Sequence, residues 1–575
     1  MSERRSLPGL VLRPGSRDAG AVQPGASDID VTNLRGRRAV HRWERTSVGD
    51  VLERLTWSYP DKVAITGWAG AYSDDRFRTL TFRQADELAN QVAHALLERG
   101  LEPSSRVLLL CENSVEAYVA KIGIAKAGMV AMPLNPALAP DVLEHLIARA
   151  EPAFAIVDAE LWPRAEQAFA ARGLAVGATI PIGGGAVAGS PTFAELVDGR
   201  PVTEPDVEIH GDDVWQLLFT SGTTAMPKGV MLSHSASHLA GLNFAVSLSR
   251  GLRIESDLVV GVFLPVVYHV ADQIFTFSAF LAGGSLVLGR RPVPAEVARA
   301  VEVERVTALW AGSPQFVTAL TTELDAAGHD WSSLRVLVFG WGALAPATYR
   351  ALLRHAGDDL VVLGIFGQTE AIACHRFWPA RWPEQAATGL NYVGVPSPLL
   401  ASDVVDELGE SLRDRPGTAG EAVYRSPIVT AGYHLDEAAT REAFRGGWFH
   451  SGDSTSVDAD GLRIMVDRFK DIVKSGGENV SSLRVESVLH DHPAVERVAV
   501  VGLPHPHWGE AVTAVVVRRA GVETTEEDVI AHCRARLAGY ETPKGVVFAD
   551  DLPETVGGKV LKYRLRERHR DLYSG

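Results

Sequence analysis

The stretch Thr220–Val230 places four hydroxyls, two glycines and one lysine within ten positions. Glycines let backbone N–H groups approach an anion closely, and hydroxyl and ammonium groups add donors, so this composition suits a polyphosphate. Lys228 is followed by glycine and apolar residues rather than by a Ser or Thr that opens a helix, so the stretch is not a Walker-type loop. A polar hairpin turn is the alternative, because Ser, Gly and Thr clusters are common in turns.

Three further segments carry groups that could act on a nucleotide. Gly364–Glu370 ends with Thr369 beside a carboxylate, and this pair suits Mg²⁺, a hard cation that prefers oxygen ligands. Asp453 follows a glycine and could accept hydrogen bonds from ribose hydroxyls. Lys559 stands in a glycine-rich loop near the C-terminus. Each segment alone carries little weight, because an Asp after Gly is usually a turn residue and a lysine near a terminus is usually solvated.

From Leu80 onward, short apolar runs alternate with helix-like stretches, and these elements must position the groups above. The short runs predict strands, and the stretches between them predict helices. Such an alternation predicts an α/β fold in which helices cover parallel-rich sheets. The predicted strands are Arg106–Cys111, Val130–Leu134, Phe154–Val157, Val214–Phe219, Arg335–Phe339 and Leu360–Gly364, and the predicted helices are Ser114–Ala127 and Asp141–Ala150.

The length of 575 residues exceeds the size at which one hydrophobic core keeps growing, so we expect two or more domains. Residues 1–40 are rich in Gly, Pro, Arg and Asp without an apolar period, which predicts a disordered tail. A dense charge cluster, Asp467–Asp471, marks a boundary. We therefore expect a large N-terminal domain at 41–467 and a small, mobile C-terminal lid at 468–575.

The lid region has the pattern of a small α+β domain. Strands are predicted near Val498–Val501 and Ala511–Val517. A helix is predicted after them, with Thr524 and Glu527 spaced as a capping box and Gly539 as its stop. About 100 residues are enough for an independent domain of this kind.

The overall composition excludes several classes of protein. A net charge of −15 argues against nucleic acid or an anionic membrane as the main partner, although a local basic site can still bind a small anion. No apolar run approaches the ~20 residues that span a bilayer, and the N-terminus lacks the apolar core of a secretory signal. Cys111, Cys374 and Cys533 are widely separated, without the spacing of a zinc site or a disulfide framework, which fits a reducing cytoplasm.

Six segments together, in this order, resemble the adenylate-forming superfamily of acyl- and aryl-CoA synthetases, peptide-synthetase adenylation domains and beetle luciferase. The resemblance covers Thr46–Leu565, nearly the whole chain. It implies that ATP activates a carboxylic acid to an acyl-adenylate with release of pyrophosphate, before transfer to a thiol. The segments are the Thr220–Val230 loop, Gln368–Glu370, His450–Asp453, Asp467–Asp471, Ser475–Asn479 and Gly557–Lys559.

The resemblance assigns a role to each matching residue. Lys559 bridges the substrate carboxylate and the α-phosphate, Thr369 contacts the α-phosphate, and Glu370 holds Mg²⁺. Asp453 accepts the ribose hydroxyls. Phe366 lies against adenine at a position that is usually Tyr in the family, so stacking is kept and a hydroxyl is lost. The residues expected at the nucleotide are Thr220, Ser221, Gly222, Thr223, Thr224, Lys228, Gly342, Ala343, Phe366, Gly367, Asp453 and Arg468.

The second half-reaction of the family needs a rotated lid. The hinge residue of the family falls on Lys470, for which an ordinary exposed lysine is the alternative. After rotation, Gly476 and Gly477 line the path of the pantetheine arm, where a narrow tunnel favours residues without side chains.

The acid-binding pocket is expected at His269, Trp341 and Gly367. Acetyl-CoA synthetases have a Trp where this chain has Gly367, so we expect an acid larger than acetate. Trp341 replaces a family glycine, which favours a compact, cyclic or medium-length hydrophobic acid if its ring lines the pocket. The alternative is that the ring of Trp341 turns into the core.

The expected cofactors and partners are ATP, Mg²⁺, a small carboxylic acid and CoA, with the pantetheine of an acyl carrier protein as the alternative acceptor. A third hypothesis is an inactive nucleotide-binding relative, but the intact Glu370, Asp453 and Lys559 argue against it. Homodimers are frequent in the family.

Overall fold

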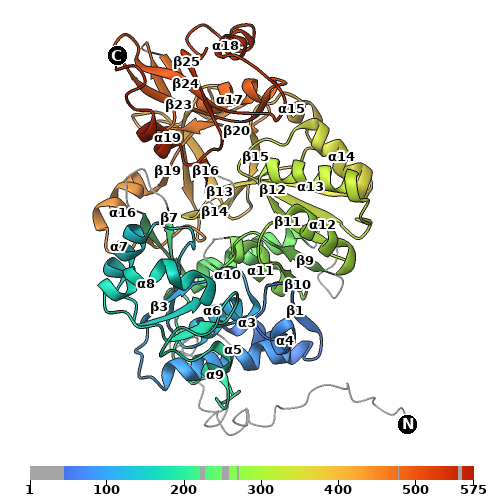
Figure 1. Cartoon of the computed structure of the whole chain (residues 1–575), viewed down its shortest axis with the longest axis vertical. Coiled ribbons are helices and arrows are strands. Elements are labelled where there is room, and N and C mark those ends of the chain that lie inside the picture. Colours follow the sequence, from blue (N-terminus) through green and yellow to red (C-terminus); the bar gives the residue numbers. More distant parts are fainter. Residues whose placement is uncertain are drawn as a thin grey trace.

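The computed structural model describes residues 45–220, 227–248, 258–267, 271–476, 478–554 and 560–574. The tail predicted at 1–40 lies outside these residues. The described strands form three sheets of seven, thirteen and five strands. Figure 1 shows the red C-terminal unit, which holds the five-stranded sheet, at the top of the molecule. The predicted α/β class, with a large N-terminal portion and a smaller C-terminal unit, is confirmed.

The strand pair that flanks the predicted phosphate loop, β7 and β8, lies near one edge of the seven-stranded sheet, next to the edge strand β18. The order of this sheet is β18-β8-β7-β4-β3-β5-β6. The strands from β7 to β6 pair in parallel, whereas β7, β8 and β18 pair antiparallel. Helices connect the parallel strands, as the alternation predicts. The elements are β3 (Arg106–Leu110), α6 (Val115–Lys126), β4 (Val130–Pro133), α7 (Pro140–Ala150), β5 (Phe154–Asp158), α8 (Trp162–Ala171), β6 (Ala178–Ile180), β7 (Val214–Thr220), β8 (Lys228–Ser233) and β18 (Gly432–Tyr433).

The thirteen-stranded sheet changes from parallel to antiparallel near its middle. Its order is β16-β17-β19-β20-β15-β14-β13-β12-β11-β9-β10-β1-β2. Strands β1, β10, β9, β11, β12 and β13 pair in parallel, and every pairing from β13 to β16 is antiparallel. The strands are β1 (Val63–Gly67), β2 (Thr79–Thr81), β9 (Val259–Val262), β10 (Ser285–Leu288), β11 (Ala308–Gly312), β12 (Val336–Gly340), β13 (Val361–Gln368), β14 (Ala371–Phe377), β15 (Tyr392–Pro396), β16 (Ala401–Val405), β17 (Gly420–Arg425), β19 (Phe449–Val457) and β20 (Arg463–Arg468).

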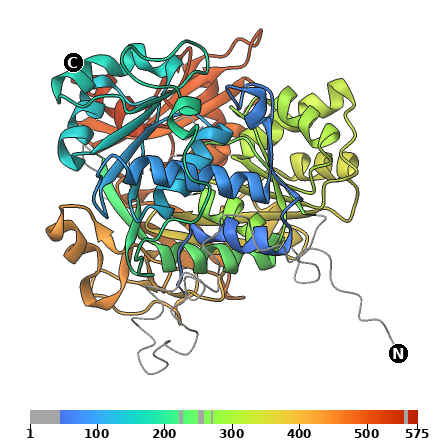
Figure 2. The ribbon, with the colours of Figure 1, turned by 90° about the horizontal axis from the view of Figure 1, so that it is seen from below.

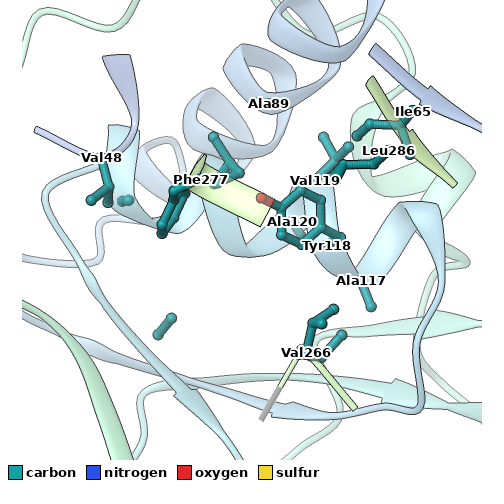
Figure 3. Packing of buried hydrophobic residues seen from close by; sticks show 14 of the residues in the cluster. Val48, Ile65, Ala89, Ala117, Tyr118, Val119, Ala120, Val266, Phe277 and Leu286 are labelled. Carbon is teal, nitrogen blue, oxygen red and sulfur yellow. The ribbon is translucent and has the colours of Figure 1, made fainter. Parts of the chain in front are cut away.

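The largest apolar cluster joins these two sheets. It contains side chains from strands of both sheets and from α3 (Asp50–Ser58), α5 (Phe82–Leu97), α6, α10 (His234–Leu248) and α11 (Ala271–Leu281). Figure 3 shows Tyr118 of α6 amid this cluster, with Ala89, Val266 and Phe277 around it. Seen from below, blue N-terminal helices cross the middle of the molecule between the cyan and the yellow-green segments (Figure 2). The two sheets therefore share one core.

Helix α6 shows how local signals and burial agree. The Ser114 hydroxyl accepts a hydrogen bond from the Ala117 N–H at 3.1 Å and caps the helix, and Gly128 follows it in a left-handed conformation with φ +67°. Every residue of α6 is buried. Even Lys126 is fully buried, where its ammonium lies 2.7 Å from a carboxylate oxygen of Asp86 and 2.7 Å from one of Glu204.

The C-terminal unit contains the five-stranded sheet and its helices. The predicted strands are confirmed and run longer than expected. The elements are β21 (Val473–Ser475), β22 (Glu478–Val480), α17 (Ser482–His490), β23 (Val495–His505), β24 (Gly509–Arg518), α18 (Glu526–Arg534), β25 (Gly545–Ala549) and α19 (Lys562–Arg568).

The capping box predicted for the helix of this unit is wrong by one residue. Thr525, not Thr524, is the N-cap of α18, and Asp528, not Glu527, completes the box. Both Thr-x-x-acid pairs occur in the sequence, and the burial of Val529, Ile530 and Cys533 selects one of them. The helix ends at Arg534, so Gly539 is not its stop.

Candidate active site

The turn between β13 and β14 presents the predicted magnesium-binding carboxylate. Gln368 pairs with Ala371, so Thr369 and Glu370 are the two residues of a tight antiparallel turn. The Glu370 carboxylate is buried, and its Oε1 accepts a hydrogen bond from the Tyr433 hydroxyl at 3.0 Å. Burial and the neighbouring Glu370 carboxylate raise the pKa of Tyr433, so the phenol remains a proton donor.

The predicted phosphate loop joins two antiparallel strands. Thr220 at the end of β7 pairs with Lys228 at the start of β8, so the hairpin considered as an alternative is present. A hairpin does not exclude phosphate binding, because it holds both ends of such a loop. The Lys228 ammonium lies 4.9 Å from the centroid of the Tyr433 ring. The central loop residues Ser221, Gly222, Thr223 and Thr224 lie outside the described residues.

A segment that the sequence reasoning missed, residues 429–434, connects the two sheets at this point, and we call it the connecting segment. The Thr430 N–H donates to the Glu370 carbonyl at 2.7 Å, and the His434 N–H donates to the Gly229 carbonyl at 2.7 Å. The two residues of β18 within it, Gly432 and Tyr433, pair with β8. The segment has no motif that points to phosphate chemistry, and its partners are distant in sequence, so only the fold reveals it.

The predicted ribose-binding pair lies on β19 and β20. Asp453 pairs with Arg468 in the ladder, and the Arg468 Nε lies 3.1 Å from the Asp453 Oδ1. Asp453 is almost fully buried, whereas Arg468 is partly exposed. The Gln368 side-chain amide donates to the Ser451 carbonyl at 3.3 Å and links this pair to the β13–β14 hairpin. The structure thus brings the Glu370 turn and the Asp453 strand together.

The residues predicted to border adenine follow two neighbouring strands. Gly340 of β12 pairs with Ile365 of β13, so the loop that holds Gly342 and Ala343 leaves the sheet beside Phe366. Phe366 is half-buried, and its ring centroid lies 6.1 Å from that of His375. Burial keeps the pKa of His375 well below its usual value, so this ring is neutral.

Trp341 does not turn into the core, so that alternative is wrong. Its side chain is 43% exposed, and its backbone adopts a left-handed conformation with φ +67°. The indole packs edge-on against Trp310, with ring centroids 5.5 Å apart, and Trp310 stacks on Phe275 at 4.6 Å. A bulky residue at positive φ is strained, so the surrounding structure must hold it there.

The expected pocket segment after β9 is only partly described. Leu264, Val266 and Val267 are buried in the large cluster, and His269 lies outside the described residues. A β-carbon at Gly312 would lie 2.4 Å from a methyl of Leu264 and 3.2 Å from the Trp341 ring. A glycine is therefore required where these two side chains meet.

A divalent cation fits this site only together with phosphates. Within the described ranges, no group of three or more His, Cys, Asp or Glu side chains could hold a metal ion. Glu370, with Thr369 beside it, offers oxygen donors next to the hairpin of Lys228. Mg²⁺ commonly binds to one or two carboxylates, water and substrate phosphates, and this donor set fits that mode.

The predicted hinge lies in the turn between β20 and β21. Lys470 is exposed, and its carbonyl accepts a hydrogen bond from the Arg566 guanidinium of α19 at 3.2 Å. Just before it, the Asp467 carboxylate accepts hydrogen bonds from the N–H and the hydroxyl of Ser482, both at 2.6 Å. Side-chain contacts therefore attach the C-terminal unit to the end of β20.

Gly476 has a local reason to be glycine. Its φ is +62°, and a β-carbon there would lie 3.0 Å from the Trp508 ring. A role of this glycine beside a thiol arm stays a prediction. Gly477 and Lys559 lie outside the described residues, although Glu554 and Val560 pair as a bridge on either side of the Lys559 loop.

None of the described helices is long and apolar enough to cross a bilayer.

Comparisons with known proteins match nearly all of the described chain. The AMP-binding enzyme family matches residues 52–434, and the AMP-binding enzyme C-terminal domain matches residues 484–559. A feruloyl-CoA synthase from Amycolatopsis sp is 34% identical over 493 residues, which are 85% of this chain and 94% of that protein. A long-chain-fatty-acid–CoA ligase from Thermus thermophilus is 32% identical over 545 residues, or 92% and 97% of the two chains.

A solved structure has the same arrangement of elements. The anthranilate CoA ligase AuaEII in complex with anthranoyl-AMP superposes with a TM-score of 0.80 at 26% identity, over 92% of this chain and 98% of that chain. The resemblance to adenylate-forming enzymes is confirmed by these matches. The hairpin of Lys228, the Glu370 turn and the Asp453–Arg468 pair therefore lie in a protein that belongs to the AMP-binding enzyme family.

Proposed function

We propose that this protein is an AMP-forming acid–CoA ligase that acts on a hydrophobic carboxylic acid. The observation that carries the proposal is the meeting of Lys228, Glu370 and Tyr433, which come from two different sheets. A cation beside a carboxylate suits Mg-ATP, and the Asp453–Arg468 pair nearby suits its ribose. The relatives named as CoA ligases support this reaction class.

The first half-reaction joins two anions. A carboxylate oxygen of the acid attacks the α-phosphorus of ATP, a new O–P bond forms, and the bond to the bridging oxygen breaks as pyrophosphate leaves with its electron pair. Lys228 would hold the outer phosphates, and Lys559 would bridge the carboxylate and the α-phosphate. Thr369 would contact the α-phosphate, and Glu370 would hold Mg²⁺, which offsets phosphate charge. Little covalent chemistry is required of the protein, so positioning dominates.

The second half-reaction exchanges AMP for a thiol. The CoA sulfur attacks the acyl carbon, a C–S bond forms, the C–O bond to AMP breaks, and the thiol proton passes to solvent. We propose that the part of the predicted lid that follows Lys470 turns about this residue between the two steps, while Arg468 stays on β20. The attachment of this unit by side-chain contacts at Asp467 supports such a movement, because these contacts can be exchanged without breaking a sheet.

For the acid, we propose a medium-length or cyclic hydrophobic molecule rather than acetate. Gly367 is exposed and adds no side chain to the wall, which leaves more room than the Trp of acetyl-CoA synthetases. The exposed indole of Trp341, supported by Trp310, offers a flat apolar surface at the neighbouring loop. A compact or planar acid would gain more from this surface than a long straight chain.

A panel of acids tests the proposal. Acetate, octanoate, palmitate, benzoate and cinnamate are incubated with ATP and Mg²⁺, and pyrophosphate release and thioester formation are measured with and without CoA. We expect release and thioester with the aromatic acids or octanoate, and little with acetate. Absence of release with every acid would contradict the reaction class. Release without thioester in the presence of CoA would instead indicate a carrier-protein pantetheine as the acceptor.

A further inference from the structure

Tyr433 contacts the functional groups of both sheets at once. Its hydroxyl donates to the Glu370 Oε1 at 3.0 Å, and its ring lies 4.9 Å from the Lys228 ammonium. Its own backbone belongs to β18, which extends the seven-stranded sheet beside β8. No other described aromatic ring bridges these two groups.

We propose that Tyr433 is a positioning residue that couples the phosphate-binding lysine to the magnesium-binding carboxylate. This inference rests on the proposed function, because it takes Glu370 as a ligand of Mg²⁺ and Lys228 as a ligand of phosphate. Tyr433 itself touches neither ATP nor the acid in this assignment. Its role is to set the geometry of the two residues that do.

The hydroxyl orients the carboxylate. A carboxylate on a residue of a two-residue turn can rotate, and each rotation changes which oxygen faces the cation. The hydrogen bond from Tyr433 occupies Oε1 of Glu370 and leaves Oε2 to bind the metal. Such a bond to a charged acceptor is stronger than one between neutral groups, so it favours one rotamer.

The ring orients the lysine. An ammonium over an aromatic face is attracted by the ring and restricted in its rotamers. Lys228 begins β8, so its side chain leaves the hairpin at the mouth of the predicted phosphate loop. The backbone of the connecting segment fixes the ring in turn, because Ala431 donates to Met231 at 3.0 Å and His434 donates to Gly229 at 2.7 Å.

Two substitutions separate these two functions. Tyr433→Phe keeps the ring under Lys228 and removes only the hydrogen bond to Glu370. Tyr433→Leu removes both contacts. A matched control is Tyr392→Phe, which removes a phenol hydroxyl near the Asp458 carboxylate elsewhere in the thirteen-stranded sheet.

The measurement is ATP binding to the full-length enzyme by calorimetry, without acid or CoA, over a series of Mg²⁺ concentrations. We expect Tyr433→Phe to raise the Mg²⁺ concentration at half-maximal ATP binding about tenfold, with saturating Mg²⁺ restoring most of the affinity. Tyr433→Leu should weaken ATP binding about threefold further, and this part should not be restored by Mg²⁺. Tyr392→Phe should match the wild type.

A double-mutant cycle with Glu370→Gln shows whether the hydroxyl acts through the carboxylate. If it does, Tyr433→Phe adds less than twofold to the Mg²⁺ requirement in the Glu370→Gln background. If the effects of Tyr433→Phe and Glu370→Gln on the Mg²⁺ requirement were additive, the proposal would be overturned. It would also be overturned if Tyr433→Phe left the Mg²⁺ requirement unchanged, whether or not the melting temperature of this variant falls. Failure of the wild type to bind ATP, or an unaltered Mg²⁺ requirement in Glu370→Gln alone, would instead contradict the proposed function.

Discussion

The nucleotide-binding side of the large portion and the joint to the C-terminal unit are held by different kinds of contact. Asp453 and Arg468 face each other in a strand ladder, and Thr220 and Lys228 do the same. At the joint, by contrast, Ser482 binds the Asp467 carboxylate through its N–H and hydroxyl. Backbone ladders fix positions cooperatively, whereas a few polar contacts can be exchanged for others at small cost.

The difference suggests a division of labour within the proposed reaction. The pair that would hold the ribose in both steps, first of ATP and then of the acyl-adenylate, lies on the rigid framework, which keeps it ready for use. The groups needed in only one step, Lys559 and the Gly476 region, lie beyond the exchangeable joint. Substitutions on the two sides should therefore separate the two half-reactions.

The largest effect is expected at Lys559. Lys559→Ala should lower acyl-adenylate formation about 10³-fold, because the charge that offsets the two anions is removed. Thioester formation from a synthetic acyl-adenylate should change little. Both steps are measured separately, with Arg568→Ala on the exposed side of α19 as the control. An equal loss of both steps would refute the assignment of Lys559 to the first step alone.

A smaller effect, confined to the second step, is expected at the joint. Lys470→Pro fixes φ at about −65° and keeps the carbonyl that accepts from Arg566. If the lid turns here, thioester formation should fall about 10²-fold, since a displacement of 1 Å can cost that much. Pyrophosphate release in a single turnover should stay near the wild-type rate. An unaltered overall turnover would count against a hinge at this residue.

On the framework side, Asp453→Ala should weaken nucleotide binding in both steps, of ATP in the first and of the acyl-adenylate in the second. We expect the KM for ATP to rise about tenfold, which is typical of losing a hydrogen bond to a charged group. The KM for the acid should stay the same. Asp460→Ala, at an exposed turn of the same hairpin, is the matched control. A change in acid KM without a change in ATP KM would show that Asp453 does not bind the nucleotide.

The smallest effect is expected at Trp341. Trp341→Gly removes the exposed indole and relieves the left-handed strain at φ +67°. If the ring lines the acid pocket, the ratio of kcat/KM for octanoate to that for cinnamate should rise about threefold to tenfold, which is the usual range for a change in an apolar contact. ATP affinity serves as the internal reference. An unchanged ratio would remove Trp341 from the pocket.

Much of the fold follows from local patterns. Several elements lie where the sequence predicts them. Short apolar runs predict the strands at Arg106–Leu110 and Phe154–Asp158, and the capping residue Ser114 and the terminal Gly128 bound the helix between them. The error at Thr524 has a local cause too, because two overlapping capping patterns fit the sequence equally well. Burial of Val529 decided between them, and burial is a property of the folded chain.

The sequence by itself determined which groups could do chemistry. Residue type and short spacing alone indicate groups that can bind phosphate, a metal ion and ribose. These groups are the hydroxyls and lysine of the Thr220–Val230 loop, the Thr369–Glu370 pair and Asp453. Only the tertiary structure decided how they act together. Tyr433 contacts Glu370 and Lys228, although it is distant from both in the sequence. The contact forms because β18, the edge strand of the seven-stranded sheet, lies beside the Glu370 turn of the thirteen-stranded sheet, and no local sequence pattern predicts such an arrangement.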